Sequence, residues 1–452
     1  MTSKLEAFQA YAAGFELSSG GAGWNEAIPF YERAVEIDPD FAAAYHMLAL
    51  MHDWARRPRL AAVYAQKAYA LKDRLGEIEQ LPITSRYHRL VTGDMNKFIE
   101  TLKLQKRLFP RERGGSMGLA QAYLLIGRYD QALAEAREAI RLHPDYLGGH
   151  SLQEQTLLRL NRFAEAKAAF AQAFQQNPVE RGFNTVLYQI AFIQGDSAGM
   201  QQQIDKIDKS DRQLAEYGLL ESRLAAFGGQ WRKAQELSRR AIDLARRSDT
   251  EEVTAQYLTE QALFDALFGD CPLARAQATN GLSLERGRAS LPLAAFALAM
   301  CGETEQVKVL MTELTERYPM DTLINELRLP VIRAAMELQH DKAAEAIEQL
   351  QTAARFEAAA AFWPQYLRGQ AFLQLNKGAA AAAEFQKILD HRGEAPLSVL
   401  YPLAHLGVAR AAAMVGDKAK SQKAYDDFLA AWKDADSDLP PLLEAKAEYA
   451  KR

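Results

Sequence analysis

A five-residue segment, Gly114–Gly118, matches the G-x-S-x-G pattern that surrounds the nucleophilic serine of many hydrolases. That serine is reactive only on a sharp turn between a β-strand and a helix. Here the preceding residues, Leu104–Phe109, belong to a predicted helix that Pro110 ends, because proline cannot continue a helix. We therefore interpret the segment as a flexible turn that leads into the next helix, and Ser116 as a non-catalytic residue.

The eight histidines give no sign of a metal site. His46 and His52 are six residues apart, which is not the i, i+4 spacing of a helical metal pair. The sequence lacks H-E-x-x-H, a phosphate-binding Walker loop and a strand–G-x-G-x-x-G–helix unit. His391-Arg392-Gly393 begins like a kinase catalytic loop, but no Asp follows and no D-F-G occurs. We predict a protein that is not an enzyme, with no catalytic residue, metal or cofactor.

A basic stripe is the strongest charge pattern in the chain. Its arginines recur at steps of seven and eight residues, which keeps them on one helix face. The stripe could dock an acidic partner, but interspersed Glu236 and Asp243 favour a solvated outer face. The net charge of −4 gives no sign of the overall basic charge that is typical of nucleic-acid-binding proteins. The stripe consists of Arg232, Arg239, Arg240, Arg246 and Arg247.

The two cysteines, Cys271 and Cys301, are too few for a disulfide framework or a four-cysteine zinc site. Both are expected near turns of adjacent helical units, so they could be neighbours. We nevertheless favour two free thiols, which suit a reducing compartment. The sequence contains no apolar run long enough to span a membrane and no signal-peptide pattern.

The helices that would position any functional site recur along the chain at a regular spacing. In the segment 117–178, seven residues are followed exactly 34 positions later by a second set at the same spacing, with a proline closing each copy. Ala132, Ala136 and Ala139 form one helical stripe that allows a neighbouring helix to approach closely. Such a period predicts helix–turn–helix units that bury their apolar faces by stacking on one another. The residues are Tyr123, Gly127, Tyr129, Ala132, Ala136, Ala139 and Pro144, followed by Leu157, Asn161, Phe163, Ala166, Phe170, Ala173 and Pro178.

These residues resemble the tetratricopeptide repeat (TPR). The resemblance implies an all-α fold, a right-handed superhelix of about twelve repeats with a C-terminal capping helix. We expect a single continuous solenoid over residues 1–452, in which each repeat contacts only its neighbours. Residues 1–178 hold the five well-conforming repeats, 179–438 hold degenerate repeats six to twelve, and 439–452 form the cap. Gly281–Ser290 and His391–Ser398 are interpreted as long loops between repeats.

In proteins of this kind the first helix of each repeat lines a concave groove that receives a peptide or protein. The resemblance therefore places polar and aromatic first-helix residues in a partner-binding groove. For each of them the alternative is that it simply packs between repeats. The residues are His46, Asp53, Trp54, Tyr87, Gln121, Gln155, Arg159, Gln189, Phe192 and Arg223.

A narrower resemblance concerns the TPR domains that follow the catalytic domain of bacterial, acidobacterial-type, eukaryote-like Ser/Thr protein kinases. Related arrays also follow winged-helix regulators. The likeness implies a docking or regulatory module whose kinase domain lies outside this chain. It also implies that the module is cytoplasmic or, if it belongs to a membrane kinase, extracytoplasmic. The matching segments are Leu5–Tyr11, Ala27–Ala34, Leu187–Phe192, Tyr366–Ala371 and Glu384–Gly393.

Two functions follow from this pattern. The favoured one is an interaction scaffold that binds a peptide or protein in an open groove lined by polar and aromatic side chains. The alternative is a sensor that binds a small effector and changes its curvature to regulate an attached kinase or transcription-factor domain. An effector would require an enclosed apolar pocket with a few convergent polar groups.

Overall fold

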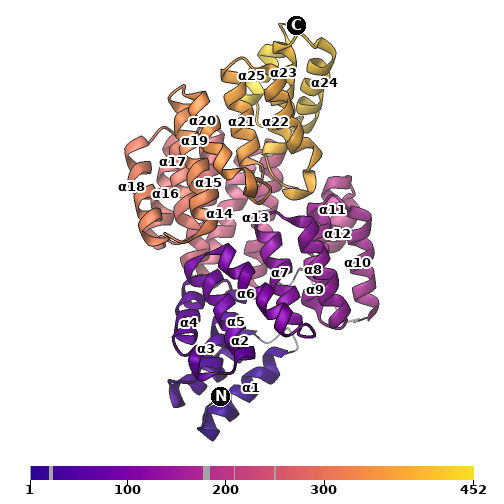
Figure 1. The fold of residues 1–452 in the computed structure, drawn as a ribbon. Coiled ribbons are helices and arrows are strands. Elements are labelled where there is room, and N and C mark those ends of the chain that lie inside the picture. Colours follow the sequence, from indigo (N-terminus) through magenta and orange to yellow (C-terminus); the bar gives the residue numbers. More distant parts are fainter. Residues whose placement is uncertain (1, 20–23, 177–183, 208, 249–250, 452) are drawn as a thin grey trace. The chain divides into compact units, whose positions relative to one another are not determined.

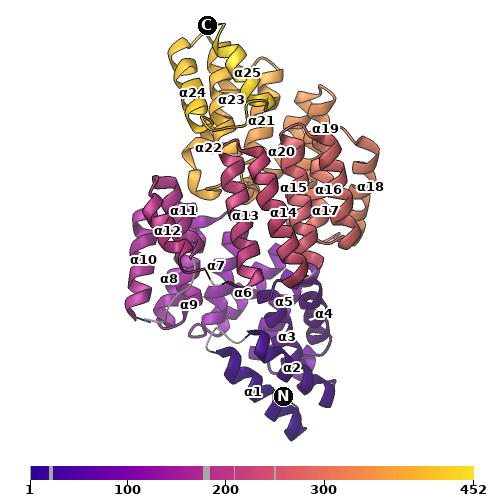
Figure 2. The same cartoon turned by 180° about the vertical axis from the view of Figure 1, so that it is seen from behind.

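The protein is built from helices throughout its described part (Figures 1 and 2). The computed structural model describes residues 2–19, 24–176, 184–207, 209–248 and 251–451. Within these ranges there are 25 α-helices and no β-strand. Consecutive helices form twelve pairs, α1/α2 to α23/α24, and α25 stands alone after the last pair. The predicted all-α architecture of about twelve helix–turn–helix repeats with a C-terminal helix is confirmed.

Small residues bring the two helices of a repeat together. Ala132, Ala136 and Ala139 of α8 are completely or almost completely buried, and α8 packs against α7. Gly127 ends the turn between them with φ of 75°, a left-handed conformation that glycine adopts without steric cost. Asn161 lies 34 residues later with φ of 58°, so asparagine fills the same position in the next repeat.

Several turns use a Gly-Asp pair to end one helix and start the next. At Gly416-Asp417 the glycine has φ of 78°, and the aspartate carboxylate accepts a hydrogen bond from the Lys420 amide at 3.0 Å. This N-cap satisfies an amide at the start of α24 that has no partner within the helix. Asp94, Asp196 and Asp270 cap α6, α12 and α16 in the same way.

The chain divides into two compact units. Unit 1 comprises residues 1–153 and 318–323, and unit 2 comprises residues 154–317 and 324–452. The prediction of one continuous solenoid over 1–452 stays a prediction. The helices that begin in unit 1 are α1 Leu5–Ser19, α2 Trp24–Ile37, α3 Ala42–Trp54, α4 Pro58–Ala70, α5 Glu77–Tyr87, α6 Met95–Leu108, α7 Arg113–Leu125, α8 Tyr129–Leu142 and α9 Leu147–Arg159, with the 3₁₀ turn η1 Lys72–Arg74 and the π-helical turn η2 His88–Thr92.

Unit 2 contains the remaining repeats. Its first helices pack along the array, α15 on α17, α17 on α19, α19 on α21 and α21 on α23. The helices are α10 Phe163–Gln176, α11 Thr185–Gln194, α12 Ser197–Ile204, α13 Asp211–Phe227, α14 Trp231–Ser248, α15 Glu251–Leu267, α16 Cys271–Leu284, α17 Ser290–Met300, α18 Thr304–Arg317, α19 Leu329–Gln339, α20 Ala343–Ala353, α21 Trp363–Gln374, α22 Gly378–Asp390, α23 Leu400–Met414, α24 Lys418–Ala431 and α25 Pro440–Tyr449, with the short turns η3 Ile324–Arg328, η4 Ala354–Ala360 and η5 Arg392–Glu394.

The G-x-S-x-G segment lies inside a helix and not in a turn, so that part of the sequence interpretation is wrong. All five residues belong to α7, and Ser116 is buried. A methyl group on Gly118 would come within 2.4 Å of Leu102, and one on Gly115 within 2.9 Å of Lys106. The glycines therefore serve the close packing of α7 on α6, and the serine has no strand-to-helix elbow.

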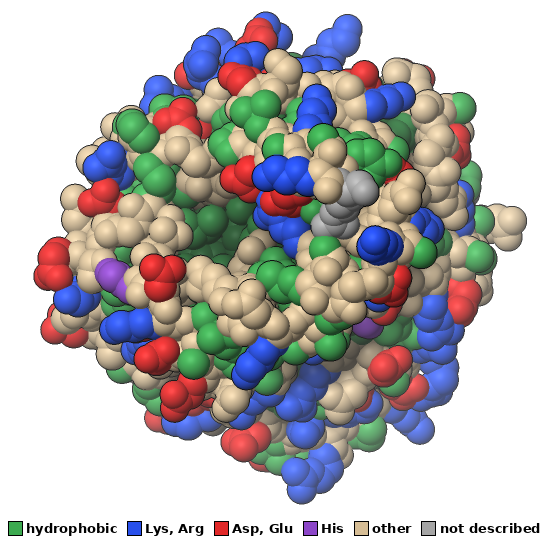
Figure 3. All heavy atoms as spheres, turned by 90° about the horizontal axis from the view of Figure 1, so that it is seen from above, with side chains coloured by type: hydrophobic (Ala, Val, Ile, Leu, Met, Phe, Trp, Pro, Cys, Tyr) green, Lys and Arg blue, Asp and Glu red, His purple; other side chains and the backbone are tan. Residues whose placement is uncertain are grey.

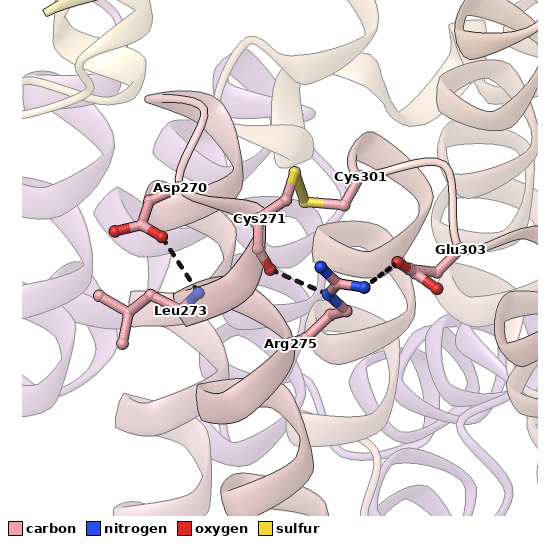
Figure 4. Close-up of a disulfide and its surroundings, with 6 residues drawn as sticks. All are labelled: Asp270, Cys271, Leu273, Arg275, Cys301 and Glu303. Carbon is pink, nitrogen blue, oxygen red and sulfur yellow. Dashed lines mark hydrogen bonds and ion pairs between the residues drawn. A yellow bond between two sulfur atoms is a disulfide. The ribbon is translucent and has the colours of Figure 1, made fainter.

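The prediction of two free thiols is also wrong. Cys271, the first residue of α16, forms a disulfide with Cys301, which follows α17, and their Cα atoms are 5.5 Å apart (Figure 4). Beside it, Arg275 donates to Glu303 at 2.9 Å, so an ion pair joins the same two repeats. Stacking of repeats eight and nine brings the two turns together, which sequence separation alone does not reveal. The argument for a reducing compartment loses its support.

Candidate functional site

A cavity of about 450 Å³ in unit 2 is the strongest candidate for a binding site. First helices of repeats eight to twelve and the capping helix α25 form its entire lining. The C-terminal part of the chain faces the viewer in Figure 3, and this face is hollowed, with hydrophobic side chains in its depth. The apolar lining consists of Ala266, Leu267, Met300, Ala335, Leu338, Leu367, Leu403, Leu406 and Pro441.

One arginine of the cavity is held by carboxylates of the capping helix. Arg410 on α23 donates through Nη2 to Glu444 at 2.7 Å and through Nε to Glu448 at 3.0 and 3.1 Å. Tyr425 also donates to Glu448, at 2.7 Å. Hydrogen bonds to the two glutamates outweigh burial and raise the pKa of Arg410, so the guanidinium is charged and its orientation is fixed.

The other polar groups of the lining are uncharged. Gln370 and Gln374 are four residues apart on α21, which places them on one helix face, and Gln339 comes from the neighbouring α19. Burial raises the pKa of Tyr366, which is hydrogen-bonded to Gln370, so its hydroxyl stays protonated. Amide and hydroxyl groups can both donate and accept hydrogen bonds. The cavity can therefore bind another amide group in several orientations.

Residues far apart in the chain also meet within unit 2, at a contact that we call the seam. The Arg392 guanidinium lies over three aromatic rings, with its Cζ atom 5.4, 5.7 and 4.8 Å from the centroids of Phe192, Phe227 and Tyr401. Its Nη1 donates to the Ile193 carbonyl at 3.3 Å. Each cation–π contact contributes about 0.5–2 kcal/mol, more where water is excluded. The loop expected merely to join repeats eleven and twelve therefore binds repeats six and seven.

Further contacts complete the seam. The Asn161 side chain donates to the Asp390 carbonyl at 2.7 Å and accepts from the Gly393 amide at 2.7 Å. The Trp432 indole donates to the Phe227 carbonyl at 3.0 Å. The expectation that each repeat contacts only its neighbours is therefore wrong for unit 2, because the superhelical curvature returns repeats eleven and twelve to repeats five to seven.

In unit 1 the structure brings two predicted groove residues into one polar cluster. Asp53 on α3 accepts a hydrogen bond from Arg89, and the Arg86 guanidinium is 4.0 Å away. Burial, together with the charge of Arg86, lowers the pKa of His46 to about 3, so this histidine is neutral. The carboxylate of Asp53 thus already has partners, and His46 is partly buried beside them.

Aromatic residues predicted for the groove in unit 1 pack against other aromatic residues. Trp54 lies against Trp24 with ring centroids 5.3 Å apart. Tyr87 stacks on Tyr69 at 3.9 Å. Gln121 is half-buried on α7. For Trp54 and Tyr87, packing between helices accounts for the side chain, which is the alternative that the sequence left open.

The five predicted groove residues of unit 2 are separate from the cavity. Arg223 forms a two-point ion pair with Glu260 at 2.6 and 2.7 Å. Phe192 belongs to the seam. None of the five lines the cavity. The remaining three lie on first helices, exposed Gln155 and half-buried Arg159 on α9 and half-buried Gln189 on α11.

The cavity residues were missed although a signal for them existed. Gln370, Gln374 and Arg410 are polar first-helix residues of repeats eleven and twelve, the same criterion that selected residues up to Arg223. Applying it to all twelve repeats would have included them. That they line one cavity, however, depends on superhelical curvature, which the repeat period does not specify.

The basic stripe of α14 is a solvated face with acidic neighbours. Arg240 pairs with Glu236, and Arg247 pairs with Asp211 at 3.3 Å. Arg232 contacts Asp438 at 2.6 Å, an ion pair at the edge of the seam. The three arginine side chains are more than half exposed, so each pair adds at most about 1 kcal/mol to stability. The favoured interpretation of the stripe agrees with the structure.

Asp265 of α15 should make the stability of unit 2 depend on pH. It is fully buried, and Gln235 and Gln261 each donate to its Oδ1 at 3.1 Å. Burial raises its pKa from 3.8 to about 7. Between these values the folded state keeps a proton that the unfolded state has lost, so this contribution to stability is lost as pH rises from about 4 to 7. We expect the free energy of unfolding of Asp265→Asn to increase, relative to that of wild type, by about 2–4 kcal/mol between pH 4 and pH 8.

Urea unfolding of both proteins at pH 4.5, 6 and 8 measures this difference. Asp243→Asn, on the exposed face of α14, is the matched control and should show no such trend. A difference between wild type and Asp265→Asn that does not change with pH would contradict the assignment of a protonated buried carboxyl group.

Comparisons with known proteins give matches only among solved structures. No family model and no curated protein matches the chain. A chain of the APC/C hetero-tetramer Cut9–Hcn1 is 13% identical, with a TM-score of 0.47 over 98% of this chain and 76% of that chain. Yeast Tom70 is 12% identical, with a TM-score of 0.36 over 98% and 95%. The P58(IPK) TPR domain is 13% identical, with a TM-score of 0.25 over 83% and 98%. In the described part of the chain no helix is long and apolar enough to cross a membrane.

Proposed function

We propose that the chain is a non-enzymatic interaction scaffold whose cavity in unit 2 binds a short segment of a partner protein. The observation that supports this is the cavity itself, about 450 Å³ with an apolar lining and amide, hydroxyl and guanidinium groups. Apolar surface supplies affinity, and a few placed polar groups fix the orientation of the bound segment.

The partner would link the scaffold to a signalling protein. The resemblance of five segments to TPR domains of bacterial Ser/Thr kinases supports a docking module for such a kinase. On this proposal the attached domain performs the chemistry, and the helical array selects what is brought to it.

A second function is favoured by the apolar walls of the cavity and the few polar groups among them. The same apolar walls could hold a small effector, and the capping helix α25, which contributes Pro441 and Glu444, would then respond to it. The two functions share one site but differ in the size of the ligand.

Filling the cavity tests the proposal. Gln370→Trp places a large ring in the cavity from a half-buried position on α21, whereas Gln351→Trp on α20 adds the same ring at an exposed position outside it. Twelve-residue peptides selected from a random array with wild type should bind Gln370→Trp at least tenfold more weakly and Gln351→Trp unchanged. Tenfold corresponds to about 1.4 kcal/mol.

Two outcomes decide against the peptide function. Selected peptides that bind Gln370→Trp as tightly as wild type would place the site elsewhere. If no peptide binds, but a compound from a metabolite panel raises the melting temperature of wild type and not of Gln370→Trp, the sensor is the correct function.

A further inference from the structure

We propose that the cavity of unit 2 takes an internal peptide residue with an aliphatic side chain, uncharged or singly positive, and rejects a terminal carboxylate. This inference rests on the proposed function and names its ligand class. It follows from the charge, the hydrogen-bonding groups and the apolar lining of the cavity.

The arginine of the site already has carboxylate partners. Glu444 and Glu448 bind the guanidinium of Arg410, at 2.7 Å and 3.0 Å. Carboxylates therefore already compensate its charge before any ligand binds. A ligand carboxylate placed there would be the third around one arginine, and like charges at this distance repel. A neutral or positive group meets no such penalty, and a positive one is attracted.

Hydrogen-bonding groups of both kinds face the cavity. Arg410 donates, Glu444 accepts, and the amide of Gln370 does both. A peptide bond presents one N–H and one C=O, so an internal residue can satisfy a donor and an acceptor at once. Glu444 has an exposed side chain at the margin of the cavity and can accept from the ligand without leaving Arg410.

The apolar lining accounts for the side chain of the ligand. Leu338 comes from α19, and Leu403 and Leu406 come from α23, beside a space of about 450 Å³ in total. Burying an aliphatic side chain there removes apolar surface from water, which favours binding.

Three tripeptides that differ only at their ends test the inference. They are acetyl-Ala-Leu-Ala-amide with no charge, Ala-Leu-Ala-amide with one positive charge, and acetyl-Ala-Leu-Ala with one negative charge. Dissociation constants come from ligand-observed saturation-transfer NMR on the full chain at low ionic strength. We expect the neutral and positive peptides to bind, and the negative one to bind at least tenfold more weakly.

A charge variant shows whether the discrimination arises at Arg410. Glu444→Gln removes one of the two carboxylates at Arg410 and should reduce the tenfold discrimination to threefold or less. Glu345→Gln removes the same charge from the exposed face of α20, outside the cavity, and should leave the discrimination unchanged. Equal effects of the two variants would show that net charge, and not the site, is responsible.

Other outcomes overturn the inference. A negative peptide that binds as tightly as the neutral one refutes it, as does the absence of binding by all three peptides to wild type. In either case the proposed function is judged separately, by whether array-selected peptides lose affinity for Gln370→Trp.

Discussion

Replacing Trp432 with alanine is expected to destabilise unit 2 by about 3–5 kcal/mol, because the change removes a large ring from a close-packed core. Trp432 is almost completely buried, between Phe268 at 6.0 Å and Phe428 at 4.8 Å. Its indole N–H also donates to the Phe227 carbonyl, which the variant leaves without this partner. Urea unfolding followed by circular dichroism measures the loss.

The location of the effect distinguishes a seam from an ordinary core. Because Trp432 joins repeat twelve to repeats seven and eight, hydrogen exchange in the variant should accelerate in α13 and α14 as well as in α24. Trp432→Phe keeps most of the ring and loses only the N–H, so it should cost about 1–3 kcal/mol. Faster exchange confined to α22–α25 would show that the seam does not couple the distant repeats.

Removing the disulfide should cause the next largest loss of stability. Cys271→Ser opens a loop defined by a sequence separation of 30. In the chain-entropy account, a cross-link across that length stabilises by about 3–4 kcal/mol, because it restricts the unfolded chain. The melting temperature of the oxidised wild type should exceed that of the variant and should fall when dithiothreitol is added.

Reduction supplies the internal control for this prediction. The reducing agent should lower the melting temperature of wild type to near that of Cys271→Ser and leave the variant unchanged. Ser283→Ala on the same helix α16 controls for loss of a single polar atom at an exposed site. A wild type whose stability does not change on reduction would mean that the two repeats are held by packing alone.

The sequence by itself determined the local units of this protein. The small-residue stripe of Ala132, Ala136 and Ala139 and the left-handed positions Gly127 and Asn161 specify a helix, a turn and a second helix within one repeat. These features depend on contacts between residues fewer than 40 positions apart, so a period visible in the sequence carries them. The twelve helix pairs and the final α25 were predictable for this reason.

Only the tertiary structure decided which side chains meet across repeats. Arg392 lies about 200 residues from Phe192 in the chain, and the pairing of Cys271 with Cys301 depends on the angle between two repeats. A small rotation at each interface adds up along the array, and the sum determines where the seam closes and which side chains line the cavity. No single repeat encodes that sum, so sequence periodicity predicted the helices and left the binding site undetermined.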